Sequence, residues 1–344
     1  MKRKLKSLFR IAVGFVTIGA VMVIVGLLLG GAGELSKEVT ELVHIMRVGI
    51  SETVERIPLL ERITNFNGFT VVVDWDKDDV SVDINEAFET IQGDYCNLEL
   101  ADADEVTNLD ISILNGVFRI LPSANGCFGV ESSGAEKYQC YVSEETLYLN
   151  ALPKDFGKSE DAEIILYVPV EKEYEKIFLF CSGERVTIEV ALNGKEIKFS
   201  SICGENVVQQ MLEFEDTVIT VGVGTLAVNA LVSEHLKLEV GTAEAVIEEM
   251  SVNDVEVNLG VGSLSMKGST DGDIVLNCGM GSLELVLAGP QEAYNYDISG
   301  SAESVQIGTD TLAGMVMERW IDHGANKKIT MSCAMGSVKV EFEE

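Results

Sequence analysis

The sequence has few of the residues on which most enzymes and metal proteins depend. Of 344 residues, only 3 are histidine and 2 are tryptophan. None of the histidines (His44, His235 and His323) lies in an HExxH pair, and none of the 7 cysteines forms a CxxC pair. No GxxxxGK[ST] string is present, so nucleotide binding by a P-loop has no motif. We therefore expect no catalytic, cofactor-binding or metal-binding residues, and a protein that is not an enzyme.

Positive charge is also scarce beyond the N-terminus. Five basic residues precede the first acidic one, Glu34: Lys2, Arg3, Lys4, Lys6 and Arg10. Residues 34–344 then hold 20 basic against 56 acidic residues, a formal charge of −36. Such a surface repels phosphate backbones and anionic lipid headgroups. The charge therefore excludes nucleic acid as a partner, although it would attract cationic peptides or divalent cations.

Residues 11–32 form an apolar run without a charged residue. A membrane-spanning helix needs roughly 20 apolar residues, whereas the apolar core of a cleaved signal peptide has only about 7–15. Since positive charge tends to stay in the cytoplasm, residues 1–33 are predicted to be a cytoplasmic basic tail and a transmembrane helix. Residues 34–344 would then lie outside the cell membrane. Cleavage near Gly33 remains an alternative.

Two segments follow the predicted span. In residues 34–60, Leu35, Val39, Leu42 and Met46 recur at the period of an amphipathic helix, which predicts a juxtamembrane helix that Pro58 ends or interrupts. It would serve as a spacer or as a docking helix. Residues 61–104 are predicted to be an acidic linker, and residues 69–75 and 80–84 have the composition of a strand hairpin.

The segment 105–344 reads as a domain of short strands. Strand-like text occurs at 108–113, 117–121, 146–152, 164–168, 176–180 and 186–190. Four glycines then follow at equal intervals along the chain: Gly222, Gly241, Gly260 and Gly279. A fixed period of about 20 residues is typical of repeat architectures. The copies cover residues 217–231, 235–250, 254–269, 273–287, 296–308 and 328–343. The fold class predicted is all-β, a β-solenoid or β-helix-like stack of about 19-residue coils.

Apolar residues repeat with the same period on both sides of the glycines. One column is Val221, Val240, Leu259 and Cys278, and the other is Leu226, Ala245, Leu264 and Leu283. Both are expected to point inward and to form ladders between stacked coils. Glycine at the corners would permit a sharp bend and keep bulky side chains out of neighbouring layers. The strings Gly222–Thr225, Gly260–Ser263 and Gly279–Ser282 are therefore interpreted as corners and not as phosphate loops.

Four other features suggest hypotheses of their own. Cys127 and Cys140 flank a turn-like stretch and are candidates for a disulfide across a hairpin. Trp75, Trp320, Tyr294 and Tyr296 are either packing residues or a surface for stacking sugars. Asp271-Gly272-Asp273 is a turn signal. Residues 312–326 interrupt the repeat, and a loop or short helix covering the side of the stack is expected there.

The coils resemble the bacterial putative-adhesin domains made of β-strand repeats. The resemblance rests on several sequence segments. They are residues 162–190, in which Val-Pro separates two predicted strands, the segments VGVGTLAV, LGVGSLSM and CGMGSLELVL, and the C-terminal segment CAMGSVKVEF. The resemblance covers roughly residues 94–344. It implies a β-solenoid-like fold, frequent membrane anchoring outside the cytoplasm and, for some members, a place beside envelope-stress signalling systems. It supplies no catalytic residues.

These observations favour a single-pass, membrane-anchored extracytoplasmic binding or scaffold module with a role in envelope sensing or stress response. Its expected partners are the membrane, through its own helix, and an envelope protein or cell-wall polymer. The alternative is an adhesin or cell-wall glycan-binding protein. An enzyme acting on polysaccharide is a third hypothesis, which paired carboxylates across neighbouring coils would favour.

Overall fold

The structure is a computed structural model that describes residues 69–74, 79–84, 95–97, 106–113, 116–133, 137–152, 162–300, 304–312 and 317–343. Nearly all of these residues lie in strands, as predicted. Within these ranges there is no α-helix, and the one helical turn is the 3₁₀ helix η3 (Gln291–Ala293). The helices predicted at 11–32 and 34–60 lie outside the described residues.

The strands follow one another at short intervals along the chain. In chain order they are β1 (Phe69–Asp74), β2 (Asp79–Ile84), β3 (Tyr95–Asn97), β4 (Asn108–Ile113), β5 (Val117–Pro122), β6 (Gly129–Ser133), β7 (Lys137–Ser143), β8 (Thr146–Leu152), β9 (Glu163–Val168), β10 (Glu173–Cys181), β11 (Arg185–Ile188), β12 (Leu192–Thr270), β13 (Ile274–Cys278), β14 (Ser282–Ala288), β15 (Tyr294–Gly300), β16 (Ser304–Ile307), β17 (Asp310–Leu312), β18 (Met317–Ile321), β19 (Lys327–Cys333) and β20 (Ser337–Glu343). β1 and β2 pair antiparallel, which agrees with the predicted hairpin.

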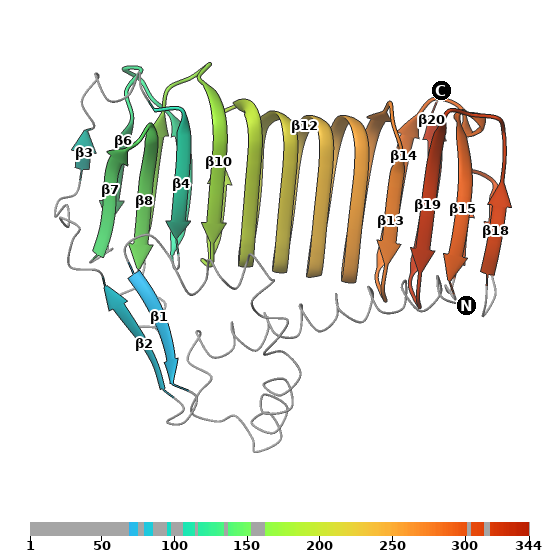
Figure 1. Cartoon of the computed structure of the whole chain (residues 1–344), viewed down its shortest axis with the longest axis horizontal. Coiled ribbons are helices and arrows are strands. Elements are labelled where there is room, and N and C mark those ends of the chain that lie inside the picture. Colours follow the sequence, from blue (N-terminus) through green and yellow to red (C-terminus); the bar gives the residue numbers. More distant parts are fainter. Residues whose placement is uncertain are drawn as a thin grey trace.

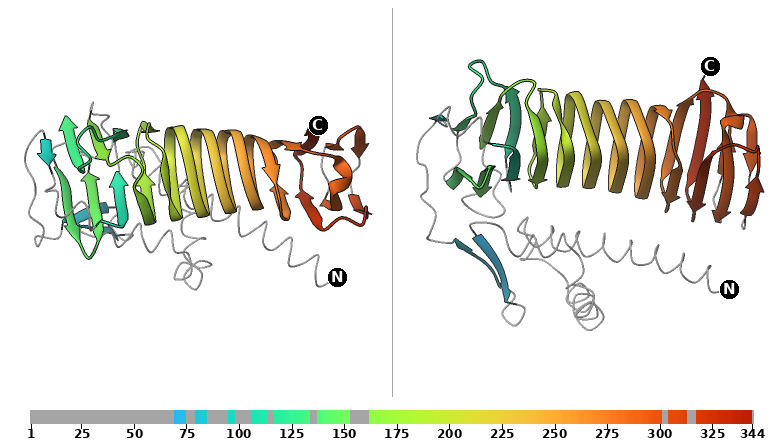
Figure 2. Two further views of the ribbon diagram at one scale, coloured as in Figure 1. Left: turned by 90° about the horizontal axis from the view of Figure 1, so that it is seen from above. Right: turned by 45° about the horizontal axis from the view of Figure 1, so that its top comes forward.

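The middle of the molecule consists of the 79-residue strand β12, whose ribbon winds repeatedly along the long axis (Figures 1 and 2). The last winding of β12 continues into β13 and β14 with a fixed offset. Val255 pairs with Ile274, and Ser263 pairs with Ser282, both in parallel and both at the interval that separates the glycines in the sequence. The period in the sequence is therefore the spacing between hydrogen-bonded neighbours.

Two long ladders run from one end of the molecule to the other, and the sheet does not close. The first has the spatial order β7–β8–β4–β10–β12–β13–β19–β15–β18. The second has the order β6–β9–β5–β11–β12–β14–β20–β16–β17, and β3 pairs with β6. In each ladder the inner pairings are parallel, and the outermost pairing at either end is antiparallel.

The core lies between the two ladders and extends along the whole stack. Alternate residues are buried, as in β9 and β13, so each strand has one dry face and one wet face. Both predicted apolar columns are buried, with Leu259 opposite Cys278 and Leu264 opposite Leu283. Each leucine or valine in these columns contributes roughly 1.5–3 kcal/mol by leaving water. No single winding can bury this surface alone, so the windings stabilise one another.

Glycine is required where neighbouring windings come closest. Gly262 has a φ of +147°, and a Cβ there would overlap the carbonyl oxygen of Ala243 in the winding before it. Gly224, with a φ of +120°, stands in the same relation to Gly204. The most demanding positions therefore come two residues after the glycines that first define the period. At Gly222 a Cβ would lie 2.5 Å from the carbonyl oxygen of Ile202, which is also too close.

The two ends differ from a stack that follows chain order. The pair β4–β5 lies between β8–β9 and β10–β11, and the pair β19–β20 lies between β13–β14 and β15–β16. As a consequence, Cys333 in β19 lies opposite Cys278 in the neighbouring parallel strand β13, which comes several strands earlier in the chain. A loop or short helix covering the side of the stack was predicted at 312–326, and this was wrong for residues 317–321, which form β18, whereas residues 322–326 are a loop. β18 pairs antiparallel with β15 and lies at the end of the first ladder.

Candidate functional site

A shallow, open groove lies on the outward face of the second ladder. It has a volume of about 300 Å³ and spans several windings of β12 together with the start of β14. We call it the flank groove. Apart from the buried Asn206, the polar residues that line it are Glu205, Thr225, Glu244, Ser263, Ser265, Ser282 and Glu284. Because Leu226, Ala245 and Leu264 point into the core, their strand neighbours point outward into this groove.

The floor of the flank groove is a row of polar side chains in register, three of which are small and carry a hydroxyl. Thr225, Glu244, Ser263 and Ser282 occupy equivalent positions in successive windings, one in each period, and Ser263 pairs directly with Ser282. Neighbouring strands lie about 4.8 Å apart, so the row repeats at that distance. Within the described residues, the hydroxyls of Thr225, Ser263 and Ser265 make no hydrogen bond to another protein group. They are available to a ligand.

An ion pair lies at each end of the flank groove. At one end, Nη2 of Arg185 lies 2.7 Å from Oε2 of Glu205. At the other end, Nζ of Lys339 lies 2.7 Å from Oε1 of Glu284. Among the described residues, Glu244 has no such cation, although it lies between these two carboxylates along the groove. Its charge is therefore the uncompensated one in the lining.

A buried amide stabilises the backbone beneath the groove. Asn206 is fully buried, and its Nδ2 donates hydrogen bonds to the carbonyl oxygens of Thr225, at 2.9 Å, and Gly204, at 3.3 Å. The first of these bonds joins two windings. The floor of the groove is thus fixed by its own scaffold, and a ligand would not have to order it.

Near the start of the strands in the first ladder, aspartate carboxylates accept hydrogen bonds from the backbone of the next winding. Oδ1 of Asp254 accepts a hydrogen bond from the backbone N–H of Asp273 at 2.8 Å, and Oδ1 of Asp273 accepts one from the N–H of Lys328 at 2.8 Å. His235 lies between Asp216, 3.1 Å away, and Asp254, 3.9 Å away. His235 belongs to β12. These acids are already engaged in joining successive windings.

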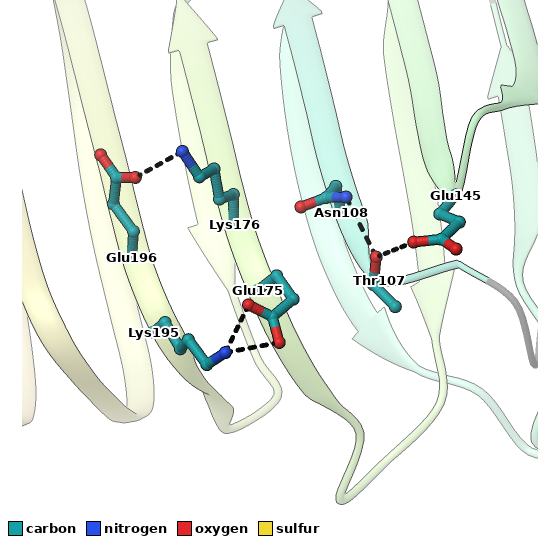
Figure 3. Close-up of polar contacts among 7 residues, drawn as sticks. All are labelled: Thr107, Asn108, Glu145, Glu175, Lys176, Lys195 and Glu196. Atoms are coloured by element: carbon teal, nitrogen blue, oxygen red, sulfur yellow. Dashed lines mark hydrogen bonds and ion pairs between the residues drawn. The ribbon is translucent and has the colours of Figure 1, made fainter.

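Charged pairs also cross between windings on the face of the first ladder (Figure 3). Nζ of Lys195 contacts both carboxylate oxygens of Glu175 at 2.7 Å, and Lys176 lies 3.2 Å from Glu196. Hydrogen bonding from Lys198 and then from Lys176 holds the pKa of Glu196 below its usual range. These pairs compensate part of the negative charge of this face, whereas Glu244 on the other face has no ion-pair partner among the described residues.

The aromatic residues considered for sugar stacking do not form a surface. Tyr294 and Tyr296 are buried, with relative exposures of 1% and 0%. Tyr294 Oη shares a hydrogen bond with the hydroxyl of Thr270 at 2.8 Å. Trp320 is 58% exposed on β18, and the side chain of Trp75 lies outside the described residues. The packing interpretation is therefore correct for the two tyrosines.

The cysteines offer no disulfide in the described part of the chain. Cys127 and Cys140 are both buried, and they do not form the disulfide considered between them. Cys278 is buried as predicted and faces the core beside Cys333. Burial raises the pKa of Cys181 above its usual range, which makes its thiol unreactive.

Two further absences concern the described residues alone. No group of three or more His, Cys, Asp or Glu side chains in them could hold a metal ion. No helix among them is long and apolar enough to cross a membrane, and the apolar run 11–32 lies outside them. The sequence did not reveal the flank groove, because only the register of β12 with β14 shows which small residues become neighbours.

Comparisons with known proteins give structural neighbours but no relatives. No family model matches the sequence, and no curated protein matches it. The solved structures to which the chain is similar include three that are described as putative adhesins. The one from Bacteroides fragilis is 17% identical, with a TM-score of 0.43, over 73% of this chain and 97% of that chain. Those from Parabacteroides distasonis and Parabacteroides merdae are 9% and 13% identical, with TM-scores of 0.35 and 0.33. They cover 74% and 76% of this chain, and 98% of each of theirs.

The descriptions of these three structures agree with the family that the sequence resembles. At TM-scores this low, however, the likeness carries no argument about the fold or the function of this chain.

Proposed function

We propose that this protein is a membrane-anchored binding or scaffold module that presents a β-solenoid outside the cell membrane. The observation that carries the proposal is the pair of ladders, which hold outward side chains in register over many windings. A stack of this kind is rigid along its length, and its flanks offer long continuous surfaces. Function then resides on the flanks and not in an enclosed pocket.

The β-solenoid interpretation is supported by the way in which the windings repeat. The offset of one period between paired strands, the continuous core and the close contacts at Gly224 and Gly262 are all expected when similar coils stack in parallel. Glycine-cornered coils are then the unit of the fold, in line with the resemblance noted in the sequence.

The proposed location rests on the N-terminal sequence. The basic residues before the apolar run 11–32 predict a single span with the N-terminus in the cytoplasm. Reporters fused after Glu344 test this topology. We expect activity from a reporter that works only after export and none from one restricted to the cytoplasm, and the reverse result would refute the location.

The binding role is tested by identifying what the exported domain holds. We expect the full chain, crosslinked in intact cells, to retain an envelope protein or a cell-wall polymer. Recovery of cytoplasmic proteins alone would refute the proposal. An envelope-sensing role predicts, in addition, that deletion of the protein changes the response to envelope stress, which a transcriptional reporter would measure.

A second candidate function is adhesion to, or binding of, cell-wall glycans. The flank groove favours it, because its hydroxyls and its uncompensated carboxylate are groups that hydrogen-bond to sugars. Sedimentation of the full chain with purified cell-wall polymers tests this function, and the absence of binding to every polymer would count against it.

A further inference from the structure

We propose that the flank groove binds a linear glycan without acidic groups, and that Glu244 gives it a preference for sugars that carry an amine. This inference rests on the proposed binding function and assigns it a site. The groove lies on the second ladder and runs along the stack. Of its outward hydroxyls, that of Ser282 accepts a hydrogen bond from Ser337, and those of Thr225, Ser263 and Ser265 remain available among the described residues.

The repeat distance of the groove suits a glycan better than a peptide. The row formed by Thr225, Glu244, Ser263 and Ser282 repeats at about 4.8 Å, which is close to the length of one pyranose unit in an extended chain. In an extended peptide, residues on the same face are about 6.6 Å apart, so their side chains would fall out of step with this row.

The backbone of the groove also disfavours a peptide. Extended peptides bind to sheets chiefly by pairing with an open strand edge. The floor of the flank groove is instead the face of a ladder whose strands are already paired on both sides, as Ser263 with Ser282 and Ser282 with Ser337. A ligand there gains hydrogen bonds from side chains alone, and hydroxyl and carboxylate groups suit the hydroxyls of a sugar.

The charges in the groove determine which glycans it accepts. Its two end carboxylates are paired with Arg185 and Lys339, and no lysine or arginine is among its lining residues. The carboxylate of Glu244 therefore has no protein cation to compensate it and would attract a protonated amine on the ligand. A uronic-acid polymer would be repelled, both by Glu244 and by the overall charge of residues 34–344.

The experiment measures binding of defined oligomers to the full chain in lipid nanodiscs. The probes are a glucosamine oligomer, its N-acetylated counterpart, a galacturonate oligomer of equal length and an oligolysine. The variants are Ser263→Trp, which fills the groove from an outward position, and Ser263→Ala, which removes only the hydroxyl. A third variant, Glu244→Gln, removes the charge. Glu248→Gln is its matched control, since Glu248 is exposed on the same winding outside the groove lining.

We expect the glucosamine oligomer to bind about tenfold more tightly than the N-acetylated one and the galacturonate oligomer not to bind. Ser263→Trp should abolish glycan binding, and Ser263→Ala should weaken it. Glu244→Gln should remove the advantage of the amine and leave the N-acetylated oligomer unaffected, whereas Glu248→Gln should change nothing.

Four results would overturn the inference. They are binding of no glycan, binding that Ser263→Trp and Ser263→Ala both leave unchanged, galacturonate binding equal to that of glucosamine, and binding of oligolysine alone, which would indicate a basic peptide instead. If these tests fail while the crosslinked chain still retains an envelope partner, the binding function stands and only its site is wrong. If the reporters place the domain in the cytoplasm, the proposed function fails whatever the groove binds.

Discussion

The centre of the molecule and its two ends are built from the same kind of strand but by different rules. Through β12, β13 and β14, each winding pairs with the one that precedes it in the chain, at an offset of one sequence period. At the ends, strand pairs are inserted out of chain order and antiparallel strands terminate both ladders. The centre thus shows how parallel pairing extends the repeat, and the ends show how antiparallel strands terminate it.

Stopping matters because a parallel ladder can in principle continue without limit. An open strand edge invites pairing with another chain, and proteins usually cover or shorten such edges. Here β7 and β18 terminate the first ladder, and β3 and β17 terminate the second. The insertion of β19–β20 between β13–β14 and β15–β16 also ties the last part of the domain to the centre.

The largest effect is expected in the centre, at Gly262. Gly262→Val places a Cβ against the carbonyl oxygen of Ala243 and forces valine to adopt a φ of +147°. The overlap and the strained backbone together should cost about 3 kcal/mol or more in the free energy of unfolding. Chemical denaturation measures it.

Gly126→Ala is the control, because Gly126 also has a positive φ but a Cβ there meets nothing within 4 Å. Its free energy of unfolding should fall by only about 1 kcal/mol, which is the cost of placing alanine in this backbone conformation. Equal losses in the two variants would contradict the assignment of Gly262 as a contact between windings.

The next largest effect is expected where the inserted strand β19 meets the last windings. Nζ of Lys327 donates to the carbonyl oxygen of Thr270 at 2.8 Å and to Oη of Tyr294 at 3.2 Å, and it lies 4.4 Å from the centre of the Tyr294 ring. Lys327→Met keeps the apolar stem and loses these contacts. We expect a loss of about 1–3 kcal/mol in the free energy of unfolding.

Lys328→Met is the matched control for this end. Its backbone N–H binds Asp273, which the substitution leaves intact. If both variants unfold at the same denaturant concentration, Lys327 does not lock the inserted strand, and the two ends are held by their backbone pairing alone.

The sequence predicts the centre far better than the ends, for a physical reason. The apolar alternation in 108–113 and 146–152 identifies β4 and β8 with correct bounds, and the period gives the register of Leu259 with Cys278. All windings share the same pattern, however, so the pattern shows that two coils can stack but not which coils do. The insertion of β19 beside Cys278 and the strand β18 were missed for this reason.

The candidate site was less predictable than the fold. Thr225, Ser263 and Ser282 are ordinary small residues in the sequence, and they become the floor of a groove only through the register of neighbouring windings. The aromatic residues were more conspicuous, yet Tyr294 and Tyr296 fill the core. Composition alone therefore pointed away from the surface that the structure offers.

A smaller effect of opposite sign is expected at Tyr174, in β10. Its side chain is buried, and its hydroxyl has no hydrogen-bond partner in the described structure. Because an unsatisfied buried hydroxyl is costly, Tyr174→Phe should stabilise the protein by about 1 kcal/mol, as measured by denaturation at neutral pH. Destabilisation would show that the hydroxyl does have a partner.

The same variant tests a pH dependence. Burial raises the pKa of Tyr174 above its usual range and that of Tyr141 to about 12. Above pH ~10 the unfolded chain loses these protons while the folded chain keeps them, so stability falls as pH rises. Tyr174→Phe should lessen that fall, and identical slopes in the two proteins would refute the burial of an ionisable group there.

The smallest effect is expected from the exposed pairs that cross between windings. The side chains of Lys195 and Glu175 are 57% and 53% exposed, although Nζ lies only 2.7 Å from the carboxylate (Figure 3). Exposed pairs gain little, because water screens the attraction and two long side chains lose freedom. Lys195→Gln should leave the midpoint of unfolding unchanged within error, at low and at high salt. A clear loss that salt removes would show that charge pairing contributes to the stacking of windings. The contrast between centre and ends would then have to include electrostatics as well as packing and backbone pairing.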